Sequence, residues 1–183
     1  MAQKRKNWNG LMSGFKVSDL VFLDESGCNT DMTRRYAYSL GGSRAVDSAP
    51  LSKPKNTTIL SSIQLDGTLH YTTFSGGTTV ERFKRYLETD LLPHLNGNSV
   101  LIMDNMKSHH AKAVKNLLDS AEIRYIYLPP YSPDLNPIEK LWSKVKAFLR
   151  KFKARTLDAL PNAIQNAFHA VTVSDCSDWF RFC

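Results

Sequence analysis

The sequence predicts an α/β domain in which helices flank a sheet, and two observations carry this prediction. First, two four-residue apolar runs, Leu20–Leu23 and Val100–Met103, are each followed directly by an aspartate, as expected for strands buried on both faces. Second, strand-like and helix-like segments alternate through the second half of the chain, which indicates parallel strands joined by right-handed crossovers.

Length and composition bound the class of protein. With 183 residues and a hydrophobic fraction of 42%, the chain can form one domain with its own core, and wholesale disorder is excluded. The net charge of +7 favours a polyanionic partner such as nucleic acid. Cys28, Cys176 and Cys183 are too scattered for a disulfide framework or a paired zinc site, which suits a reducing cytoplasm. No apolar run approaches the ~20 residues of a membrane span, so no membrane association is expected.

The first half of the chain reads as a meander of about five strands separated by turns and loops. Asp66-Gly67 is a hairpin turn signal between two β-branched segments. The prolines, serines and lysines of residues 43–56 indicate a loop. The clearest strand segments are Leu20–Leu23, Arg35–Leu40, Thr57–Leu65 and Thr68–Phe74.

Helical periodicity begins near Thr78. This threonine and Glu81 form a capping-box pattern ahead of an apolar stripe that ends before Pro93. Ser108 is a candidate cap for the helix that follows the second apolar run, and Ile123–Leu128 is the strand after that helix. These segments fit the alternation expected of an α/β sheet.

The stretch Leu128–Trp142 holds four prolines and the start of a strongly amphipathic helix. Asn136 is a favoured N-cap residue, Pro137 suits the first helical position, and Glu139 falls at the third, the capping-box position. Capping alone would explain Glu139, but a carboxylate in the first turn can also point at a bound cation. The apolar face of the helix includes Trp142, which we expect to fill the core.

Asp24 and Asp104 are the aspartates that follow the two apolar runs. If these runs are neighbouring parallel strands, both aspartates emerge at the carboxyl edge of the sheet, where α/β domains place their ligands. Two carboxylates so close repel each other unless a cation lies between them, so the arrangement calls for a metal or a raised pKa. Taken alone, either aspartate is better explained as the start of a turn or as a helix cap.

The helix that starts near Glu139 continues as a basic surface. From Lys140 to Arg155 it carries seven basic residues and no acidic one, whereas a merely solvated helix face usually mixes both signs. Basic side chains beside a metal-binding carboxylate can neutralise a nucleic-acid backbone on either side of the phosphodiester that is cut. We therefore expect DNA contacts from Lys140, Lys144, Lys146, Arg150 and Lys153.

Three motifs carry a resemblance to a known family. They are LVFLDESG at Leu20–Gly27, LIMDNMKSHH at Leu101–His110 and LPPYSPDLNPIEKLW at Leu128–Trp142. In addition, 34 residues (positions 105 to 138) separate Asp104 from Glu139. With these motifs and this spacing, the chain from about residue 19 to its end resembles the catalytic domain of insertion-sequence transposases of the mariner superfamily. Those proteins are DDE superfamily endonucleases with an RNase H-like, retroviral-integrase fold.

The resemblance implies an RNase H-like fold with a mixed five-stranded sheet flanked by helices. Asp24 would lie on the first strand, Asp104 just after the fourth and Glu139 on a helix after the fifth, and the three would form the catalytic, metal-binding triad. Two Mg²⁺ or Mn²⁺ ions held there would activate a water or a DNA 3′-hydroxyl and stabilise the leaving oxygen. The implied function is metal-dependent cleavage of DNA at element ends and strand transfer to target DNA, in a bacterial-type nucleoid.

Several neighbours of the triad are candidates for accessory roles. Asn105 can bind a phosphate or a water at the site, or merely start the next turn or helix. His109 and His110 lie further along the same motif, where one of them can contact DNA or orient the site, although such histidines are more often structural. Tyr131 can stack on bases or fill the core. Glu25 is expected to point to the opposite side of its strand, and we leave it out of the triad.

The domain organisation differs from that of full-length family members at the front. Those proteins carry an N-terminal helix-turn-helix region that reads the terminal repeats of the element. Here only residues 1–18, which read as a basic, flexible tail, precede a single catalytic domain at residues 19–183. We expect a frameshift-joined half, a truncated remnant or an excised domain, with a separately encoded helix-turn-helix partner. A homodimer is also expected, because family members generally act as dimers on paired ends.

Two alternatives remain open from the sequence. The first is another nuclease with the same fold, for example one that cuts RNA–DNA hybrids or junctions, although such enzymes lack the Pro-Tyr-Ser-Pro-Asp-Leu-Asn-Pro string of residues 130–137. The second is a catalytically idle remnant in which only the basic helix binds DNA. The presence of all three carboxylates argues against the second alternative.

Overall fold

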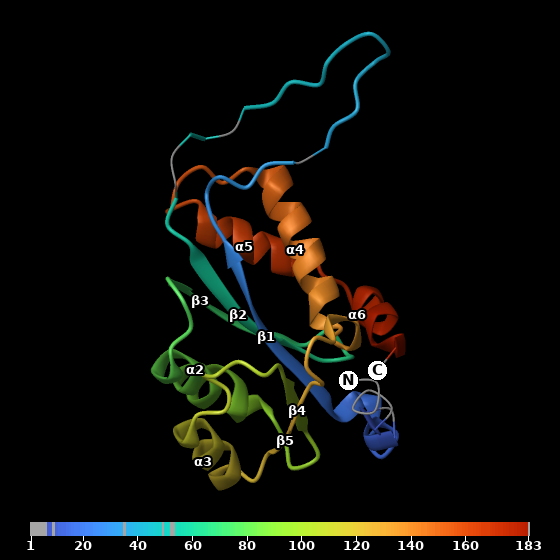
Figure 1. The fold of residues 1–183 in the computed structure, drawn as a ribbon, viewed down its shortest axis with the longest axis vertical. Helices are drawn as coiled ribbons and strands as arrows, with labels where there is room; N and C mark the ends of the chain where they lie inside the picture. The colour runs from blue at the N-terminus through green and yellow to red at the C-terminus, as the bar shows by residue number, and fades with distance from the viewer. Residues whose placement is uncertain (1–6, 9, 35, 49, 52–53, 183) are drawn as a thin grey trace.

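Five strands form one mixed sheet at the centre of the molecule (Figure 1). The computed structural model describes residues 7–182 except residues 9, 35, 49, 52 and 53. The strands are β1 (Leu20–Cys28), β2 (Thr57–Ile63), β3 (Leu69–Ser75), β4 (Val100–Met103) and β5 (Arg124–Tyr127). They lie in the order β3-β2-β1-β4-β5, with β1, β4 and β5 parallel and β2 antiparallel to β1 and β3. The predicted mixed five-stranded sheet is confirmed.

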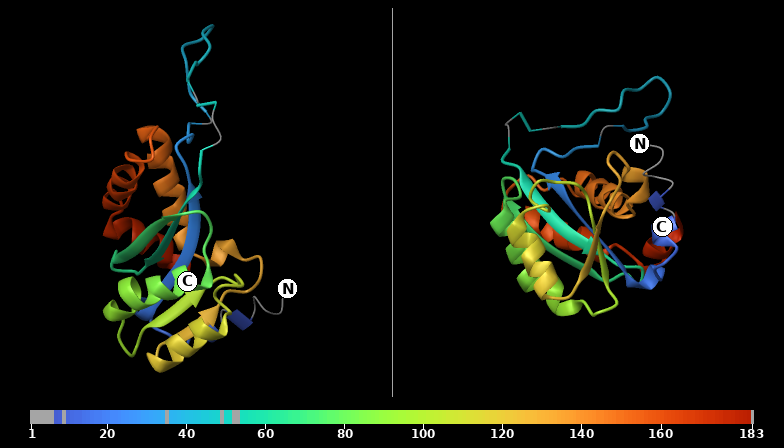
Figure 2. Two further views of the ribbon diagram at one scale, coloured as in Figure 1. Left: turned by 90° about the vertical axis from the view of Figure 1, so that its left-hand side faces the viewer. Right: turned by 60° about the horizontal axis from the view of Figure 1, so that its bottom comes forward.

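Helices cover both faces of this sheet. They are α2 (Val80–Tyr86), α3 (Lys112–Ser120), α4 (Ile138–Phe152), α5 (Leu160–His169) and α6 (Val173–Trp179). The chain continues from α2 through a wider π-type turn at Leu87–Leu91. Short 3₁₀ turns lie at Val17–Asp19, Leu92–His94, Pro133–Leu135 and Phe180–Phe182. In Figures 1 and 2, α2 and α3 lie on one side of the sheet and α4 and α5 on the other.

The central strand β1 separates two cores. Leu20 and Phe22 face the core that includes α4, α5 and α6, whereas Val21 and Leu23 face the core built with α2 and α3. All four side chains are buried, because helices cover the sheet on both faces. This two-sided burial explains why the run is continuously apolar and does not alternate with polar residues.

A long excursion, residues 29–56, joins β1 to β2 and extends away from the rest of the molecule (Figures 1 and 2). The predicted strand Arg35–Leu40 is wrong: position 35 lies outside the described residues, and residues 36–40 form no strand. Tyr36 is 88% exposed, and Tyr38 and Leu40 are exposed as well. Their β propensity has no effect here because no neighbouring strand offers a partner or a face to bury against. In the described residues the first half supplies three strands, β1 to β3, and not about five.

The hairpin between β2 and β3 forms where the sequence places it. The Gly67 amide donates to the Gln64 carbonyl at 3.2 Å, and the Thr68 amide donates to the Asp66 carboxylate at 2.9 Å. Gly67 has a φ of +88°, a conformation that glycine adopts without strain. The turn prediction at Asp66-Gly67 is therefore confirmed.

Two predicted helix caps are wrong. Thr79, one residue after the predicted Thr78, caps α2, and its hydroxyl accepts from the Arg82 amide at 3.3 Å. Ser108 does not cap α3, because that helix begins four residues later and no side chain caps it. Both errors concern helix boundaries: two adjacent threonines precede α2, and α3 begins after Ala111, which has no side chain that can cap a helix.

The described part of the expected N-terminal tail packs against the domain. Residues 7–8 and 10–12 are helical, and Trp8 and Met12 are only 5% and 7% exposed. These two side chains, four positions apart, lie on one face of the helical segment and join the core beside α4. For these residues the expectation of a solvated, flexible tail does not hold, because two apolar side chains outweigh the polar composition around them.

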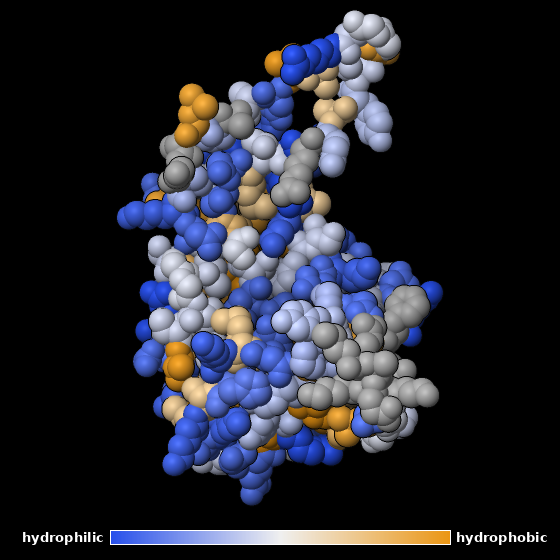
Figure 3. Space-filling view, viewed as in Figure 1, coloured by the Kyte–Doolittle hydropathy of each residue, from blue (hydrophilic) through white to orange (hydrophobic). Residues whose placement is uncertain are grey.

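The surface in Figure 3 is largely hydrophilic, and apolar residues stand out on the excursion. Leu40, Val46 and Leu51 are all strongly exposed there. Among the described helices, none combines the length and the hydropathy that crossing a bilayer would require.

Candidate active site

The register of two parallel strands places Asp24 beside Asp104. The last paired residues of β1 and β4 are Leu23 and Met103, and the next residue on each strand is the aspartate. β4 ends there, but β1 continues, with Asp24 paired to Ser61 of β2. The predicted neighbourhood of the two aspartates is confirmed. Asp24 nevertheless lies within its strand and not at its end, because β2 supplies backbone partners beyond the end of β4.

Glu139 reaches the same region from the first turn of α4. The loop before this helix starts from a fixed point: the Leu128 amide donates to the Met103 carbonyl at 2.8 Å, and the Asn105 side chain donates to the Leu128 carbonyl at 2.6 Å. The predicted capping box is wrong. No side chain caps α4, and the Asn136 Oδ1 atom is buried without a hydrogen-bond partner among the described residues. Glu139 is exposed at the surface, and no hydrogen bond from its carboxylate to the start of the helix is found among the described residues.

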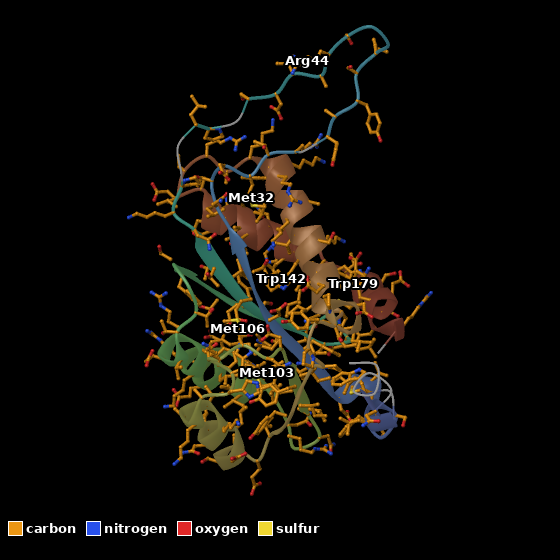
Figure 4. All side chains as sticks on the ribbon, viewed as in Figure 1. Met32, Arg44, Met103, Met106, Trp142 and Trp179 are labelled. Atoms are coloured by element: carbon orange, nitrogen blue, oxygen red, sulfur yellow. The ribbon has the colours of Figure 1, made fainter. Side chains whose placement is uncertain are left out.

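The three carboxylates line one open pocket of about 510 Å³. Its walls come from three distant parts of the chain: β1, the turn after β4, and the proline-rich loop that leads into α4. Figure 4 labels Met106, which lines the pocket, and Trp142, which approaches Asp24 from α4. The structure thus brings together Asp24, Asp104 and Glu139, the three residues that the sequence singled out.

Asp24 occupies the most unfavourable position for a negative charge. Burial raises its pKa to about 7, and the charges of Asp104, Glu25 and Glu139 act in the same direction. A hydrogen bond from the Glu25 amide, at 2.8 Å, opposes this shift. The other oxygen of Asp24 lies 3.3 Å from the indole Nε1 of Trp142. A nearby cation would therefore favour the ionised form of Asp24.

Asp104 lies in the opposite electrostatic environment. Burial alone would raise its pKa, but contacts with the His109 side chain and the Met106 amide outweigh burial and hold the pKa below its usual value. His109 Nδ1 lies 2.9 Å from Asp104 Oδ1, and the Met106 amide donates to the same oxygen at 2.9 Å. Burial would likewise lower the pKa of His109, but hydrogen bonds to Asp104 and Glu25 raise it to about 9. The second aspartate thus has a cationic partner from the protein.

Glu25 is the residue whose importance the sequence did not reveal. As predicted, alternation along β1 turns it away from Asp24, toward the face that carries α2 and α3. It nevertheless lines the same pocket, and its Oε1 lies 3.2 Å from His109 Nε2. The available signal was its place beside Asp24 in one motif and the place of His109 beside Asp104 in another, but nothing in the sequence pairs the two.

Two further neighbours, Asn105 and His110, make contacts within the described residues, whereas Tyr131 is exposed. Asn105 ties the end of β4 to Leu128, and its Oδ1 lies 3.3 Å from His110 Nε2. His110 also stacks on Tyr127, with ring centroids 4.0 Å apart. Tyr131 is 86% exposed with a φ of +55°, which excludes the core alternative for this residue.

Trp142 fills the core as predicted, and it also contacts the site. The side chain is buried among residues of the core beside α4 and α5. Its indole Nε1 reaches the Asp24 carboxylate at 3.3 Å, a contact that the apolar-face pattern did not predict. The residue therefore links the packing of α4 to the position of Asp24.

Two of the basic residues predicted to contact DNA take part in ion pairs within the chain. Lys144 Nζ lies 2.5 Å from the Asp175 carboxylate of α6, and Lys153 Nζ lies 2.5 Å from the Asp47 carboxylate of the excursion. Hydrogen bonds from Lys144 and Thr172 lower the pKa of Asp175 to about 2. These two lysines therefore connect α4 to its surroundings.

The other three predicted DNA-contact residues are differently placed. Lys140 is exposed, next to Glu139, and lines a small hollow on the outer side of that residue. Lys146 and Arg150 line another hollow of about 450 Å³ beside Asn29, at the end of β1. No ion pair of these three residues is found in the described part of the chain. They leave positive charge available along α4, and DNA contact remains a prediction for all five.

The fold and the site together define a class of protein: an RNase H-like domain with a cluster of acidic residues at the edge of its sheet. The chain belongs to the DDE superfamily endonucleases, since the model of that family matches residues 19–161. The matched range contains all three carboxylates of the pocket. The predicted family is confirmed.

Two curated relatives are transposases from nematodes. The transposable element Tc1 transposase of Caenorhabditis elegans is 29% identical over 97 residues, which cover 51% of this chain and 36% of that protein. The transposable element Tcb2 transposase of Caenorhabditis briggsae is 31% identical over 75 residues, which cover 41% of this chain and 28% of that protein. The matches thus span about a third of the length of these relatives.

Solved structures of the Mos1 transposase share the fold. The pre-cleavage Mos1 transpososome matches with a TM-score of 0.81 at 20% identity, covering 97% of this chain and 57% of that chain. The catalytic domain of Mos1 mariner transposase matches with a TM-score of 0.74 at 18% identity, covering 97% and 85%. A Mos1 paired-end complex solved with Mn matches with a TM-score of 0.77 at 20% identity, covering 95% and 54%. The predicted RNase H-like fold is confirmed.

Proposed function

We propose that this chain is the catalytic domain of a DNA transposase, with Asp24, Asp104 and Glu139 as its catalytic, metal-binding residues. One observation carries the proposal: three carboxylates from separate elements line one pocket, and burial together with their mutual repulsion raises the pKa of Asp24 to about 7. A cation bound among these carboxylates would favour the fully ionised cluster at neutral pH. Membership of the DDE superfamily endonucleases supports phosphodiester chemistry at this cation.

The donor atoms fit a hard divalent cation. All three proposed ligands are carboxylates, the type that Mg²⁺ and Mn²⁺ prefer, and the open pocket leaves room for a phosphate group. When bound, two such ions would supply Lewis acidity that activates a water or a DNA 3′-hydroxyl and stabilises the leaving oxygen. Support comes from Mos1 paired-end complexes, one solved with Mn and one with Mg.

The protein itself would hold the DNA strand and exclude misplaced phosphates. Lys140 follows Glu139 directly at the start of α4, and Lys146 and Arg150 lie further along the helix. Phosphates on either side of the cleaved bond would contact these cations, while the carboxylates repel any phosphate that approaches without a metal. Lys144 and Lys153 would contribute mainly through their long-range positive potential, because each already has a carboxylate partner.

We further propose that the reaction involves two DNA partners, an element end that is cleaved and a target that receives the freed 3′ end. Mos1 transposase was solved as a paired-end complex with the left transposon end, which supports DNA ends as the substrate class. A homodimer and a helix-turn-helix segment, supplied within a longer protein or by a separate chain, belong to the same proposal. DNA binding would place the protein at the nucleoid.

The proposal is tested by incubating the purified chain with Mg²⁺ and supercoiled plasmid DNA. The parent is expected to nick the plasmid, and Glu139→Gln is expected to abolish nicking while DNA binding, measured by electrophoretic mobility shift, stays within about twofold, since Glu139 holds metal and not phosphate. Glu88→Gln, at an exposed carboxylate paired with Lys84, is the matched control and should nick like the parent.

Three other outcomes would contradict parts of this assignment. Equal nicking by Glu139→Gln and the parent would show that Glu139 is not a catalytic residue. Cleavage of the RNA strand of a hybrid in preference to DNA would indicate another nuclease with the same fold. Salt-sensitive DNA binding without any cleavage by the parent would indicate a catalytically idle DNA-binding domain.

A further inference from the structure

A fully buried histidine connects the two neighbouring strands of the site. The His109 side chain is 0% exposed, and its two ring nitrogens face carboxylates from different segments, Glu25 within β1 and Asp104 just after β4. Nδ1 lies 2.9 Å from Asp104 Oδ1 and 3.3 Å from the Asp104 carbonyl oxygen. Nε2 lies 3.2 Å from Glu25 Oε1. The three residues therefore form one continuous chain, Glu25–His109–Asp104, beneath the pocket.

The His109 imidazole is held in place by packing and by hydrogen bonds of its backbone. Its ring lies against the Phe83 ring, with centroids 4.2 Å apart. The His109 amide donates to the Met106 carbonyl at 3.1 Å, and the Tyr127 hydroxyl donates to the His109 carbonyl at 2.9 Å. A side chain that is packed and bonded in this way cannot adopt another rotamer without disturbing the core.

These contacts determine which part of Asp104 remains available. Both the Met106 amide and His109 Nδ1 approach the same atom, Oδ1. The second contact of Nδ1, to the Asp104 carbonyl, also restrains the backbone at the point where β4 ends. The other carboxylate oxygen, Oδ2, is thereby left in a fixed orientation and has no hydrogen-bond partner within the described residues.

A metal site made of Glu25, Asp104 and His109 themselves is the competing interpretation, because one donor atom from each lies within 4.8 Å of the others. The contacts argue against it. The two nitrogens of an imidazole diverge, so only one can bind a given ion, yet here each nitrogen faces a different carboxylate. Two ring N–H groups between two carboxylates satisfy this geometry without an ion.

Of the three residues Glu25, His109 and Asp104, Glu25 has the least compensated burial. Its side chain is only 8% exposed, and its Oε2 is buried without a hydrogen-bond partner among the described residues. A carboxylate buried with a single partner contributes little net stability, because desolvation offsets the attraction. The main effect of Glu25 is therefore on the position of His109 and not on stability.

From these contacts we propose that Glu25 and His109 are positioning residues, which orient the Asp104 carboxylate so that Oδ2 faces the divalent cation of the site. Glu25 fixes the far nitrogen of the imidazole, and His109 fixes Asp104. Neither residue touches the metal or the DNA. This inference rests on the proposed function, because it takes Asp104 to be a metal ligand.

The experiment measures Mn²⁺ binding to the full chain without DNA, from the electron paramagnetic resonance signal of free Mn²⁺. His109→Asn places its amide nitrogen near the position of Nδ1 and can still contact Asp104, whereas His109→Gln reaches toward Glu25 instead. We expect His109→Gln to weaken Mn²⁺ affinity about 10- to 100-fold, Glu25→Gln about 3- to 10-fold and His109→Asn less than about threefold. His169→Gln, at an exposed residue of α5, is the control and should bind like the parent.

The outcomes separate this inference from the proposed function. A folded His109→Gln that binds Mn²⁺ as tightly as the parent would overturn the inference. An equal loss in His109→Gln and His109→Asn would also overturn it, because that result indicates lost packing and not lost orientation. Glu25→Gln preserves the side-chain volume and decides the question if the histidine variants do not fold. If the parent itself neither binds Mn²⁺ nor nicks DNA, the proposed function fails as well.

Discussion

Asp24 and Asp104 are the same residue type, each directly follows a four-residue apolar run, and they lie side by side, yet their electrostatic environments are opposite. Burial and neighbouring carboxylates raise the pKa of Asp24 to about 7. Asp104 is also partly buried, but His109 and the Met106 amide keep its pKa below the usual value. An external cation would therefore favour ionisation of Asp24 more than that of Asp104.

The difference arises from the two faces of the sheet. Asp24 faces α4, where its side-chain partner is the neutral indole of Trp142. Asp104 contacts His109, which packs on Phe83 of α2. We infer that the face with α2 keeps Asp104 ionised before a metal binds. On the face with α4, a bound metal would offset the unfavourable charge of Asp24, which makes metal binding there favourable.

The comparison is tested most directly by replacing each aspartate with asparagine. Both Asp24→Asn and Asp104→Asn should reduce nicking by at least about a thousandfold, because each removes a proposed metal ligand. Their effects on the free energy of unfolding of the metal-free protein should differ in sign at pH 8. Asp24→Asn should raise the free energy of unfolding by on the order of 1 kcal/mol, since it removes an ionised, buried carboxylate. Asp104→Asn should lower it by about 1–3 kcal/mol, since His109 loses one of its two carboxylate partners.

Urea unfolding at two pH values supplies the control for these signs. The folded-state pKa of Asp24, about 7, lies above the ordinary aspartate value of 3.8, so the folded state binds the extra proton between these pH values. The contribution of protonated Asp24 to the free energy of unfolding is fully present below about pH 4 and is lost as pH rises through about 7. The stabilisation by Asp24→Asn should therefore disappear at pH 5. A gain that is equal at pH 5 and pH 8 would contradict the electrostatic explanation.

Mn²⁺ affinity should depend on pH for the same reason. A cation competes with the proton on Asp24, so the affinity of the parent should rise by about tenfold per pH unit up to pH 7 and then level off. In Asp24→Asn the remaining weak binding should lose this dependence. Isothermal titration in buffers from pH 5.5 to 8.5 measures the profile, and an affinity that stays constant over this range would show that Asp24 is not the competing group.

A similar contrast between paired and available charges is expected along α4. Reversal of Lys146 and Arg150 to glutamate should weaken DNA binding at least about tenfold at low salt and make it less salt-dependent. Lys144→Gln should weaken it less, because Lys144 is already paired with Asp175. Fluorescence anisotropy over a salt series measures both. A loss of DNA affinity in Lys144→Gln as large as in the Lys146 and Arg150 variant would indicate that the ion pair between Lys144 and Asp175 opens when DNA binds.

Trp142→Phe should give a smaller effect. The phenyl ring keeps most of the packing but removes the indole N–H that lies 3.3 Å from Asp24. We expect a loss of about 1 kcal/mol in stability, and a change of only a few-fold in Mn²⁺ affinity. Thermal unfolding and Mn²⁺ titration measure the two quantities. A loss of affinity as large as that of Asp24→Asn would instead assign Trp142 a main role in orienting Asp24.

The core strands and the neighbourhood of Asp24 and Asp104 were predictable because their physical causes are local. Burial on both faces leaves an uninterrupted apolar run, and the run in β1 ends at Asp24 while the run in β4 ends at Asp104. The hairpin at Asp66-Gly67 is likewise encoded in two adjacent residues. Glu139 was predictable only through its motif, since its helix position alone indicated a cap that the structure does not contain.

The features that escaped prediction depend on partners distant in the sequence. β1 continues past Asp24 because β2 pairs with it, and the segment 36–40 is not a strand because nothing pairs with it. Glu25 and His109 are 84 positions apart, and no local pattern joins them. Periodicity reports which face is buried but not which residue lies opposite.

The excursion between β1 and β2 also has a consequence for folding. These two strands pair closely, yet 28 residues (positions 29 to 56) must close into a loop before the pairing forms. Relative to a two-residue turn, the loop-closure entropy of such a length costs about 2 kcal/mol. Arg155 partly offsets it by donating to the Thr30 and Met32 carbonyls near the start of the loop. The hairpin β2–β3 has no such barrier, so we expect it to form before β1 joins the sheet and completes the pocket.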